Sequence, residues 1–211
     1  MPSSVDRGGV IVVSAPSGAG KTTLCRRLLA ELADIEFSVS HTTRPAREGE
    51  RDGVDYHFVT GDAFEKLRER GEFIEWALVA EHLYGTSAAA LRRVTERGHD
   101  VLLDIDTQGA AAIRRLIPEA VHVFILPPGT EALRARLTGR QSETPASLAR
   151  RLQLARDEVD KAPGYDFIVV NDDLEEAFDR FRAIVVSTRS RRERQVRRLE
   201  GILAAFRAWR P

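Results

Sequence analysis

The chain has 211 residues, of which 43% are hydrophobic and 30% are charged, and its 32 basic side chains balance its 32 acidic ones. A chain of this length can bury one good hydrophobic core and still carry small insertions. Because the formal net charge is zero, there is no general electrostatic case for nucleic acid as a partner. No stretch approaches the run of about 20 apolar residues that a membrane helix needs. We therefore expect partners other than nucleic acid and membranes.

The single cysteine, Cys25, bears on the compartment of the protein. One cysteine excludes an internal disulfide and a zinc site built from several cysteines, and it fits a reducing environment. Residues 1–9 are polar and lack the apolar stretch of a signal peptide. These features predict a cytoplasmic protein.

A strand predicted at Val10–Val13 leads directly into a glycine-rich loop at residues 15–22, and an amphipathic run with leucines at positions 24, 28, 29 and 32 follows. The loop matches the pattern G-x-x-x-x-G-K-[ST] except at Ala15, where the pattern has glycine. In such loops backbone N–H groups surround a phosphate, and the N-terminus of the next helix favours the same anion. A chance Gly/Ser-rich turn is the alternative, but the strand and helix on either side favour a phosphate-binding loop (P-loop).

Within the P-loop, we expect the Lys21 ammonium to reach the β- and γ-phosphates of a nucleotide and the Thr22 hydroxyl to face Mg²⁺. Only three of the 32 basic residues are lysines, so a lysine at this position indicates that a compact ammonium is required there rather than a planar guanidinium. The predicted ATP-binding residues of the loop are Ala15, Pro16, Ser17, Gly18, Ala19, Gly20, Lys21, Thr22 and Thr23.

Residues 38 to about 90 are rich in turn formers and contain a short predicted strand at residues 56–59, which is typical of an inserted small domain. Arg44 and Arg47 lie three residues apart in this insert, and Tyr56 follows. Arginine grips phosphate with two hydrogen bonds, and a tyrosine hydroxyl adds another donor. A solvated surface loop would have the same composition. Beside a P-loop, however, the pattern predicts a second anion site that holds a phosphate acceptor.

Three further apolar runs, at residues 101–105, 121–126 and 167–170, predict strands that are buried on both faces. Helical periodicity covers residues 108–116, 130–138 and 145–160, and one long helix is predicted from about 174 toward the C-terminus. This alternation predicts an α/β fold in which helices cover both faces of a parallel sheet and ligands bind at the carboxyl ends of the strands.

Two features of this half of the chain bear on function. Asp104 lies at the end of a predicted strand, where a Walker-B-type carboxylate would meet a metal, although acidic residues at strand ends are often only turn formers. The segment from about Thr188 to Pro211 carries apolar residues between arginines. It is typical of a packing helix or of a helix that forms a homo-oligomer.

The motifs together resemble those of the guanylate kinases, in the nucleoside monophosphate kinase group. The resemblance runs from about Val10 to about Asp173. It rests on residues 14–23, 38–44, 49–50, 55–56, 73–77, 84–86, 103–109, 125–128, 139–140 and 170–173.

This resemblance implies a P-loop NTPase core with an inserted GMP-binding domain and a lid. It also implies that the γ-phosphoryl group of ATP is transferred to GMP with Mg²⁺ as cofactor. The implied single domain covers residues 8–205: a core of residues 8–37, 88–126 and 162–205, a GMP-binding insert of residues 38–87 and a lid of residues 127–161. Residues 1–7 and 206–211 are expected to be flexible termini.

The resemblance also implies roles for individual residues. Arg136 and Asn171 would lie near adenine, and Thr22 and Asp104 would face Mg²⁺, although the sequence alone does not separate the roles of Asp104 and Asp106. Gln141 replaces a common glycine after Arg140, which predicts a stiffer lid hinge. The implied GMP-binding residues are Ser40, Arg44, Arg47, Tyr56, Glu75, Tyr84, Thr86 and Asp106, and the implied catalytic residues are Lys21, Arg44, Arg140 and Arg151.

Base chemistry supports the role of Glu75 independently. Guanine presents N1–H and a 2-amino group as adjacent donors, and one carboxylate can accept from both, whereas adenine has a lone pair at N1. A solvated strand residue is the alternative for Glu75. For the whole chain, the alternatives are a scaffold module without catalysis and a P-loop kinase for another phosphorylated acceptor.

Overall fold

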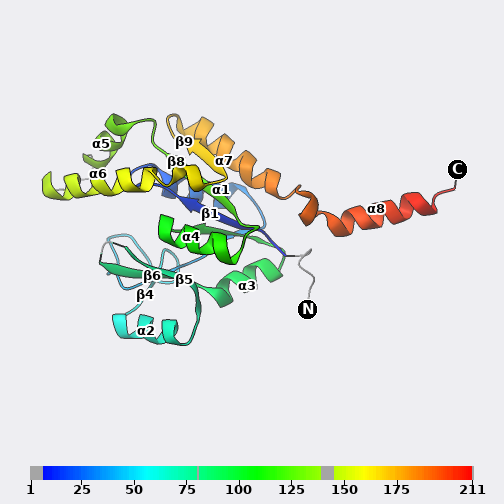
Figure 1. The fold of residues 1–211 in the computed structure, drawn as a ribbon, viewed down its shortest axis with the longest axis horizontal. Coiled ribbons are helices and arrows are strands. Elements are labelled where there is room, and N and C mark those ends of the chain that lie inside the picture. The colour runs from blue at the N-terminus through cyan, green and yellow to red at the C-terminus, as the bar shows by residue number, and fades with distance from the viewer. Residues whose placement is uncertain (1–6, 80, 139–144, 211) are drawn as a thin grey trace.

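The computed structural model describes residues 7–79, 81–138 and 145–210. A five-stranded sheet in the order β2-β7-β1-β8-β9 forms its centre (Figure 1). All four neighbouring pairs in this sheet are parallel, as the sequence predicts. The strands are β1 (Val10–Ser14), β2 (Ile35–Phe37), β7 (Asp100–Asp104), β8 (Val121–Leu126) and β9 (Phe167–Val170).

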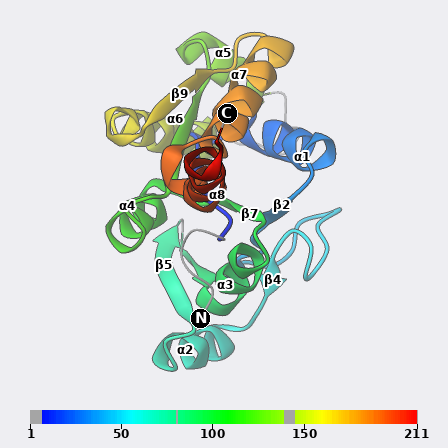
Figure 2. The same cartoon turned by 90° about the vertical axis from the view of Figure 1, so that its right-hand side faces the viewer.

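Helices cover both faces of the sheet, which confirms the predicted α/β fold (Figure 2). Side chains alternate along β1, so Ile11 and Val13 face one layer while Val10 and Val12 face the other. The first layer contains α1 (Lys21–Glu31) and α7 (Leu174–Thr188), and the second contains α3 (Ala88–Glu96) and α4 (Thr107–Leu116). Because both faces are covered, β1 is buried along its whole length and holds the P-loop that follows it in place.

A second sheet, in the order β4-β3-β6-β5, lies in the predicted insert. The antiparallel pair β5 (Phe73–Val79) and β6 (His82–Ser87) forms a hairpin, and β6 also pairs with β3 (His41–Thr42), which pairs with β4 (His57–Phe58). The helix α2 (Gly61–Glu69) buries Phe64 against this unit. Of these strands, the sequence predicts the one that became β4 and treats Glu75 as a strand residue. It does not predict β3, whose two residues pair with Tyr84 and Gly85, far along the chain.

The predicted lid contains α5 (Thr130–Thr138) and α6 (Pro145–Val159), and a 3-10 turn (Ala162–Gly164) follows it. Leu133 and Leu137 of α5 pack against Ala155 of α6. The bounds of core, insert and lid stay a prediction.

The strand β9 differs from its prediction as a strand buried on both faces. Ile168 is 45% exposed and Val170 is 40% exposed. The reason is position, since among the described strands β9 is the last of the sheet and pairs with β8 alone. The apolar run alone does not distinguish an edge strand from a central one.

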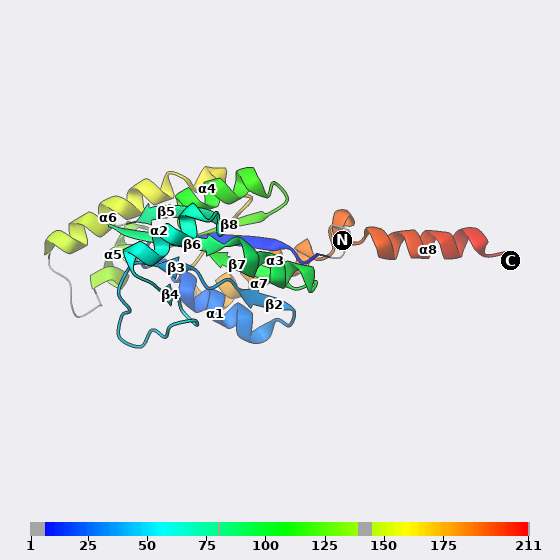
Figure 3. The ribbon, with the colours of Figure 1, turned by 90° about the horizontal axis from the view of Figure 1, so that it is seen from below.

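The prediction of one long C-terminal helix is also wrong. The helix α7 ends at Thr188, a 3-10 turn covers Arg192–Arg194, and α8 (Val196–Ala208) extends away from the body of the molecule (Figures 1 and 3). Residues 206–208, predicted as part of a flexible terminus, form the last turn of α8. Within the described part of the chain, no helix has the length and apolarity to cross a bilayer.

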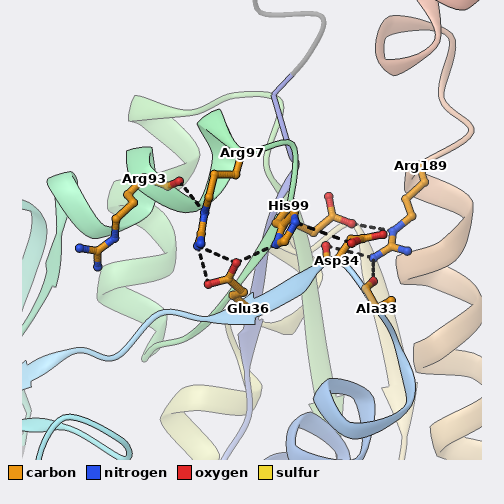
Figure 4. Close-up of polar contacts among 8 residues, drawn as sticks. Ala33, Asp34, Glu36, Arg93, Arg97, His99 and Arg189 are labelled. Carbon is orange, nitrogen blue, oxygen red and sulfur yellow. Dashed lines mark hydrogen bonds and ion pairs between the residues drawn. The ribbon is translucent and has the colours of Figure 1, made fainter.

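Charged side chains hold the junction between α7 and α8. The buried carboxylate of Asp100 pairs with Arg189 Nε at 2.7 Å and with Arg194 Nη1 at 2.8 Å, and it accepts a hydrogen bond from the Gly9 N–H. Arg189 also donates to the backbone carbonyls of Ala33 and Asp34 (Figure 4). Close to these bonds, Glu36 forms ion pairs with Arg97 and His99. These bonds tie both sides of the junction to the sheet, so they fix where the second helix starts.

Candidate active site

The P-loop connects β1 to α1 through two glycines in left-handed conformation. Gly18 has φ 92° and Gly20 has φ 93°, which residues with a side chain rarely adopt. A Cβ atom on Gly20 would lie 2.2 Å from Asn171 Nδ2. Gly20 caps the N-terminus of α1, whose first residue is Lys21. The backbone therefore favours glycine at both positions, 18 and 20.

Lys21 forms an ion pair with Asp104 at the mouth of the P-loop. The register of β1 and β7 places Val13 beside Asp104, which brings this carboxylate next to the loop. Burial by itself lowers the pKa of Lys21, but the adjacent Asp104 carboxylate outweighs burial and raises that pKa above its ordinary value. The Lys21 ammonium therefore stays charged at physiological pH.

A cleft of about 660 Å³ lies between the P-loop, the second sheet and α6. It brings together most of the predicted site residues, although they come from segments far apart in the sequence. Those that line it are Ala15, Pro16, Ser17, Gly18, Gly20, Lys21, Thr22, Thr23, Ser40, Arg44, Arg47, Tyr56, Glu75, Tyr84, Asp104, Asp106, Arg136 and Arg151.

Three predicted residues of the described part of the chain do not line the cleft. Ala19 and Thr86 are fully buried, and Asn171 lies behind the P-loop, where its side-chain amide donates to the Ala19 carbonyl at 2.7 Å. Arg136 in turn donates to the Asn171 carbonyl at 3.0 Å. Arg140 and the neighbouring Gln141 lie outside the described residues.

Arg44 is buried at one wall of the cleft, so its side chain is not part of a solvated surface, although residues 45–49 of the same loop are exposed. Its guanidinium donates to Tyr84 Oη at 3.2 Å and to Glu50 Oε1 at 2.9 Å, and it lies 5.4 Å from the centre of the Tyr56 ring. Glu50 also accepts from the Arg47 N–H at 2.8 Å. Glu50 therefore shapes this wall. It was not predicted as a site residue, although its position three residues after Arg47 in a turn was a usable signal.

Glu75 is buried, so it is not the solvated strand residue that the sequence left open. The Thr86 hydroxyl donates a hydrogen bond to Oε1 of Glu75. A Cβ atom on Gly109 would lie 2.7 Å from Oε2, so any side chain at this position would force the carboxylate to move. Burial, together with the nearby Asp106 charge, raises the pKa of Glu75 to about 7.

Asp104 and Asp106 have different surroundings. The strand β7 ends at Asp104, and Asp106 is the N-cap of α4, where its Oδ1 accepts from the Gly109 N–H at 2.9 Å. Asp104 therefore faces Lys21, whereas Asp106 lies on the side of Glu75. This difference could not be read from their spacing of two residues.

The helix α6 contributes two charged side chains to the cleft. Arg151 donates to the Ser17 hydroxyl of the P-loop at 3.0 Å. Glu158, which was not predicted, also lines the cleft, and burial raises its pKa to about 7 against the opposing effect of Lys21. No sequence signal marked Glu158, because a glutamate in a charged helix is normally solvated.

The raised pKa of Glu75 gives a prediction about stability. By linkage, raising a carboxyl pKa from 4.5 to about 7 on folding costs up to about 3 kcal/mol above pH 7. The cost is absent well below pH 4.5, where the carboxyl is protonated in both states. It grows between pH 4.5 and about 7 and is constant at higher pH. Glu75→Gln removes this charge, and Thr86 can still donate to the amide oxygen. We expect the variant to be more stable than the wild type by about 1–3 kcal/mol at pH 8 and by less than about 1 kcal/mol at pH 5.

Urea unfolding without nucleotide, at the two pH values, measures this difference. Glu72→Gln is the matched control, because Glu72 is exposed and lies three residues before Glu75. An increase in the free energy of unfolding that is the same at both pH values would contradict this role of the Glu75 charge.

Comparisons with known proteins agree with the site. The guanylate kinase family model matches residues 7–188. The guanylate kinase of Syntrophotalea carbinolica is 48% identical over 189 residues, which cover 89% of this chain and 90% of that protein. That of Neisseria meningitidis serogroup A is 48% identical over 194 residues, covering 92% and 95%. The crystal structure of guanylate kinase from Anaplasma phagocytophilum has a TM-score of 0.76 to this chain at 35% identity and covers 90% of each. The chain therefore belongs to the guanylate kinase family.

Proposed function

We propose that this enzyme binds ATP with Mg²⁺ at the P-loop and GMP at the second sheet, and transfers the γ-phosphoryl group of ATP to GMP to give ADP and GDP. The observation that carries the proposal is the single cleft that holds both the P-loop Lys21 and the buried pair of Arg44 and Glu75. One end of the cleft thus offers a cation to a polyphosphate. The other offers a cation to a phosphate and a carboxylate to a base.

The acceptor needs no general base. A phosphate monoester has its second pKa near 6 and is mostly dianionic at pH 7, so the GMP oxygen is already a nucleophile. Phosphoryl transfer proceeds through a loose transition state, and the protein acts mainly by positioning and by electrostatic stabilisation. In this proposal, Lys21 stabilises charge on the transferred group while Arg44 aligns the acceptor.

The residues beside Lys21 fit a magnesium ion bound with ATP. Hydroxyl and carboxylate oxygens are ligands that Mg²⁺ accepts, and Thr22 and Asp104 both line the cleft there. Bound Mg²⁺ would neutralise part of the phosphate charge. The Asp104 carboxylate is shared with Lys21, so it can hold the ammonium in place until the nucleotide arrives.

The second sheet supplies the GMP site. We assign the GMP phosphate to Arg44 and Tyr84, which already contact one another, with Arg47 and Tyr56 beside them. Glu75 would accept from guanine N1–H and the 2-amino group. The neighbours Ser40, Thr86 and Asp106 complete the surroundings of the base in this assignment.

The lid supplies the remaining groups. Arg151 reaches the P-loop through Ser17, which supports a role for it over the ATP phosphates, and we assign the same role to Arg140. Arg136 lines the cleft and donates to the carbonyl of Asn171 behind the P-loop, and we assign both residues to the adenine side. Closure of such a lid excludes water, which would otherwise compete with GMP as acceptor. The cytoplasm remains the expected compartment.

The experiment that tests this function measures ADP release from ATP with GMP, AMP, CMP or UMP as acceptor. GMP should be the preferred acceptor. No ADP release with any acceptor would indicate a scaffold module, and preference for another nucleotide would indicate a different P-loop kinase.

The division between acceptor site and lid gives a further prediction. Arg44 would contact the GMP phosphate before transfer, so Arg44→Ala should weaken GMP binding by about 1.5–3 kcal/mol. Arg151→Ala and Arg140→Ala should lower kcat and leave the GMP dissociation constant nearly unchanged, because lid arginines act on charge that develops during transfer. Calorimetric titration of GMP, beside steady-state rates, distinguishes the two effects.

Arg51→Ala serves as control, because Arg51 is an exposed arginine of the same loop region that does not line the cleft. Arg51→Ala should change neither kcat nor the GMP dissociation constant. Equal losses of GMP affinity in the Arg44 and Arg151 variants would contradict the two-site division.

A further inference from the structure

The helix α6 places an acidic side chain in the part of the cleft that the proposed function assigns to the phosphates of ATP. Glu158 lies one residue before the end of α6, and it lines the cleft together with Ser17 and Lys21 of the P-loop. A bound polyphosphate is stabilised by cations and N–H donors, so a carboxylate beside these groups opposes its binding. Glu158 has no role in the mechanism proposed above.

Two side chains of α6 contact the same residue of the P-loop. Arg151 donates to the Ser17 hydroxyl at 3.0 Å, and the Glu158 carboxylate accepts a hydrogen bond from the Ser17 N–H. Seven positions, about two helical turns, separate Arg151 and Glu158, so they lie on one face of α6. Ala155 lies between them and packs against α5. The helix therefore meets the P-loop through one cation and one anion.

Glu158 uses groups that a P-loop normally offers to phosphate. Such a loop binds phosphate oxygens through its backbone N–H groups and through the lysine ammonium. Glu158 takes the N–H of Ser17, and it lies close enough to Lys21 for the ammonium to favour its ionised form. A carboxylate and a phosphate are both anionic acceptors, so they compete for the same donors.

The surroundings of Glu158 show how this contact is balanced. Burial raises the pKa of Glu158 to about 7, and the Asp106 charge acts in the same direction, whereas Lys21 and the Ser17 N–H oppose both. The two groups that favour the charged carboxylate are thus the two that a polyphosphate would bind. Phosphate binding would therefore remove the contacts that hold Glu158 in place.

We propose that Glu158 is an internal competitor of the nucleotide phosphates, which occupies the Ser17 N–H, lowers the affinity of the P-loop for ATP and ADP, and speeds the release of ADP. This inference rests on the proposed function, which places the ATP phosphates at the P-loop. When they bind, Glu158 leaves Ser17, while Arg151 on the same face can stay beside them. One helix thus carries a group that favours the bound polyphosphate and a group that opposes it.

Calorimetric titration of ADP with Mg²⁺ into the full chain tests the proposal. Glu158→Gln removes the charge but keeps an oxygen that can accept from the Ser17 N–H, so the local structure should persist. The ADP dissociation constant should fall at least about fivefold in this variant, because a like charge beside the phosphates is lost. Release of a fluorescent ADP analogue, chased with excess ADP in a stopped-flow instrument, should slow by a similar factor.

Asp160→Asn is the matched control. It removes one negative charge from an exposed residue two positions further along the chain, and it should leave the ADP dissociation constant unchanged. Arg151→Ala provides the contrast on the same face of α6. It removes a cation instead of an anion, so it should not tighten ADP binding.

Inorganic tripolyphosphate shows which part of the nucleotide Glu158 opposes. This probe carries the phosphate charge of a nucleotide but has no adenine or ribose. If Glu158 competes with phosphate, Glu158→Gln should tighten the binding of tripolyphosphate as well as that of ADP.

Three results would overturn the inference while leaving the proposed function intact. They are an ADP affinity that Glu158→Gln does not change, a weaker ADP affinity, and tighter binding of ADP without tighter binding of tripolyphosphate. A weaker affinity would make Glu158 an anchor of the P-loop or a group that helps to hold Mg²⁺. A wild type that does not bind ADP at all would overturn the proposed function together with this inference.

Discussion

Lys21→Ala should lower kcat at least about 100-fold, because it removes a preorganised charge that stabilises the transferred phosphoryl group. The pair with Asp104 shows how this charge is held: the ammonium is fixed at the mouth of the P-loop before any nucleotide binds. Its raised pKa keeps it protonated at physiological pH, so the loss should appear at all pH values near 7. GMP binding should survive, because the proposed acceptor site lies on the second sheet.

Steady-state rates with saturating ATP and GMP, and calorimetric titration of GMP, measure the two effects. Lys66→Ala is the matched control, since Lys66 is an exposed lysine on α2, and it should leave both unchanged. Lys21→Ala leaves the Asp104 carboxylate without the Lys21 ammonium, which could destabilise the fold. Circular dichroism therefore checks that the variant is folded. Wild-type turnover in Lys21→Ala would place the chemistry elsewhere.

The P-loop and the parallel sheet could be predicted from the sequence because their signals are local. The buried run at Val10–Val13 and the two glycines of the loop constrain the backbone at those residues themselves. The edge position of β9 could not be predicted, because Ile168 and Val170 are as apolar as residues of a central strand. Their exposure depends on which strands lie beside them.

The cleft shows the same limit at the level of single residues. Glu50 and Gly109 fall within motifs, as Arg44 and Glu75 do, but the contacts that give Gly109 and Glu158 their roles are with residues far apart in the sequence. Gly109 is an example: it looks like an ordinary helix residue until the carboxylate of Glu75 is placed 2.7 Å from where its Cβ would be. Burial of a charged residue is likewise a tertiary property, and composition does not reveal it.

Glu75→Gln should lower kcat/KM for GMP at least about 100-fold, because two charge-assisted hydrogen bonds are lost and the amide must turn one donor toward a guanine donor. Because Glu75 is buried, water cannot replace the missing acceptor, and this increases the loss of GMP binding. The preference for GMP over AMP should shrink as well, because adenine no longer meets a carboxylate. Steady-state rates with both nucleotides measure this, and Glu72→Gln should behave like the wild type.

The pH dependence of the same variant isolates the carboxylate. Only the ionised form of Glu75 accepts both guanine donors, and its pKa is about 7, so KM for GMP in the wild type should rise as the pH falls from 8 to 6. The GMP phosphate also titrates, near 6, but it does so in both enzymes. The KM for GMP of the Glu75→Gln variant, divided by that of the wild type, should therefore fall toward 1 as the pH decreases through 7. A ratio that stays constant with pH, or an unchanged kcat/KM at pH 8, would mean that Glu75 does not bind the base.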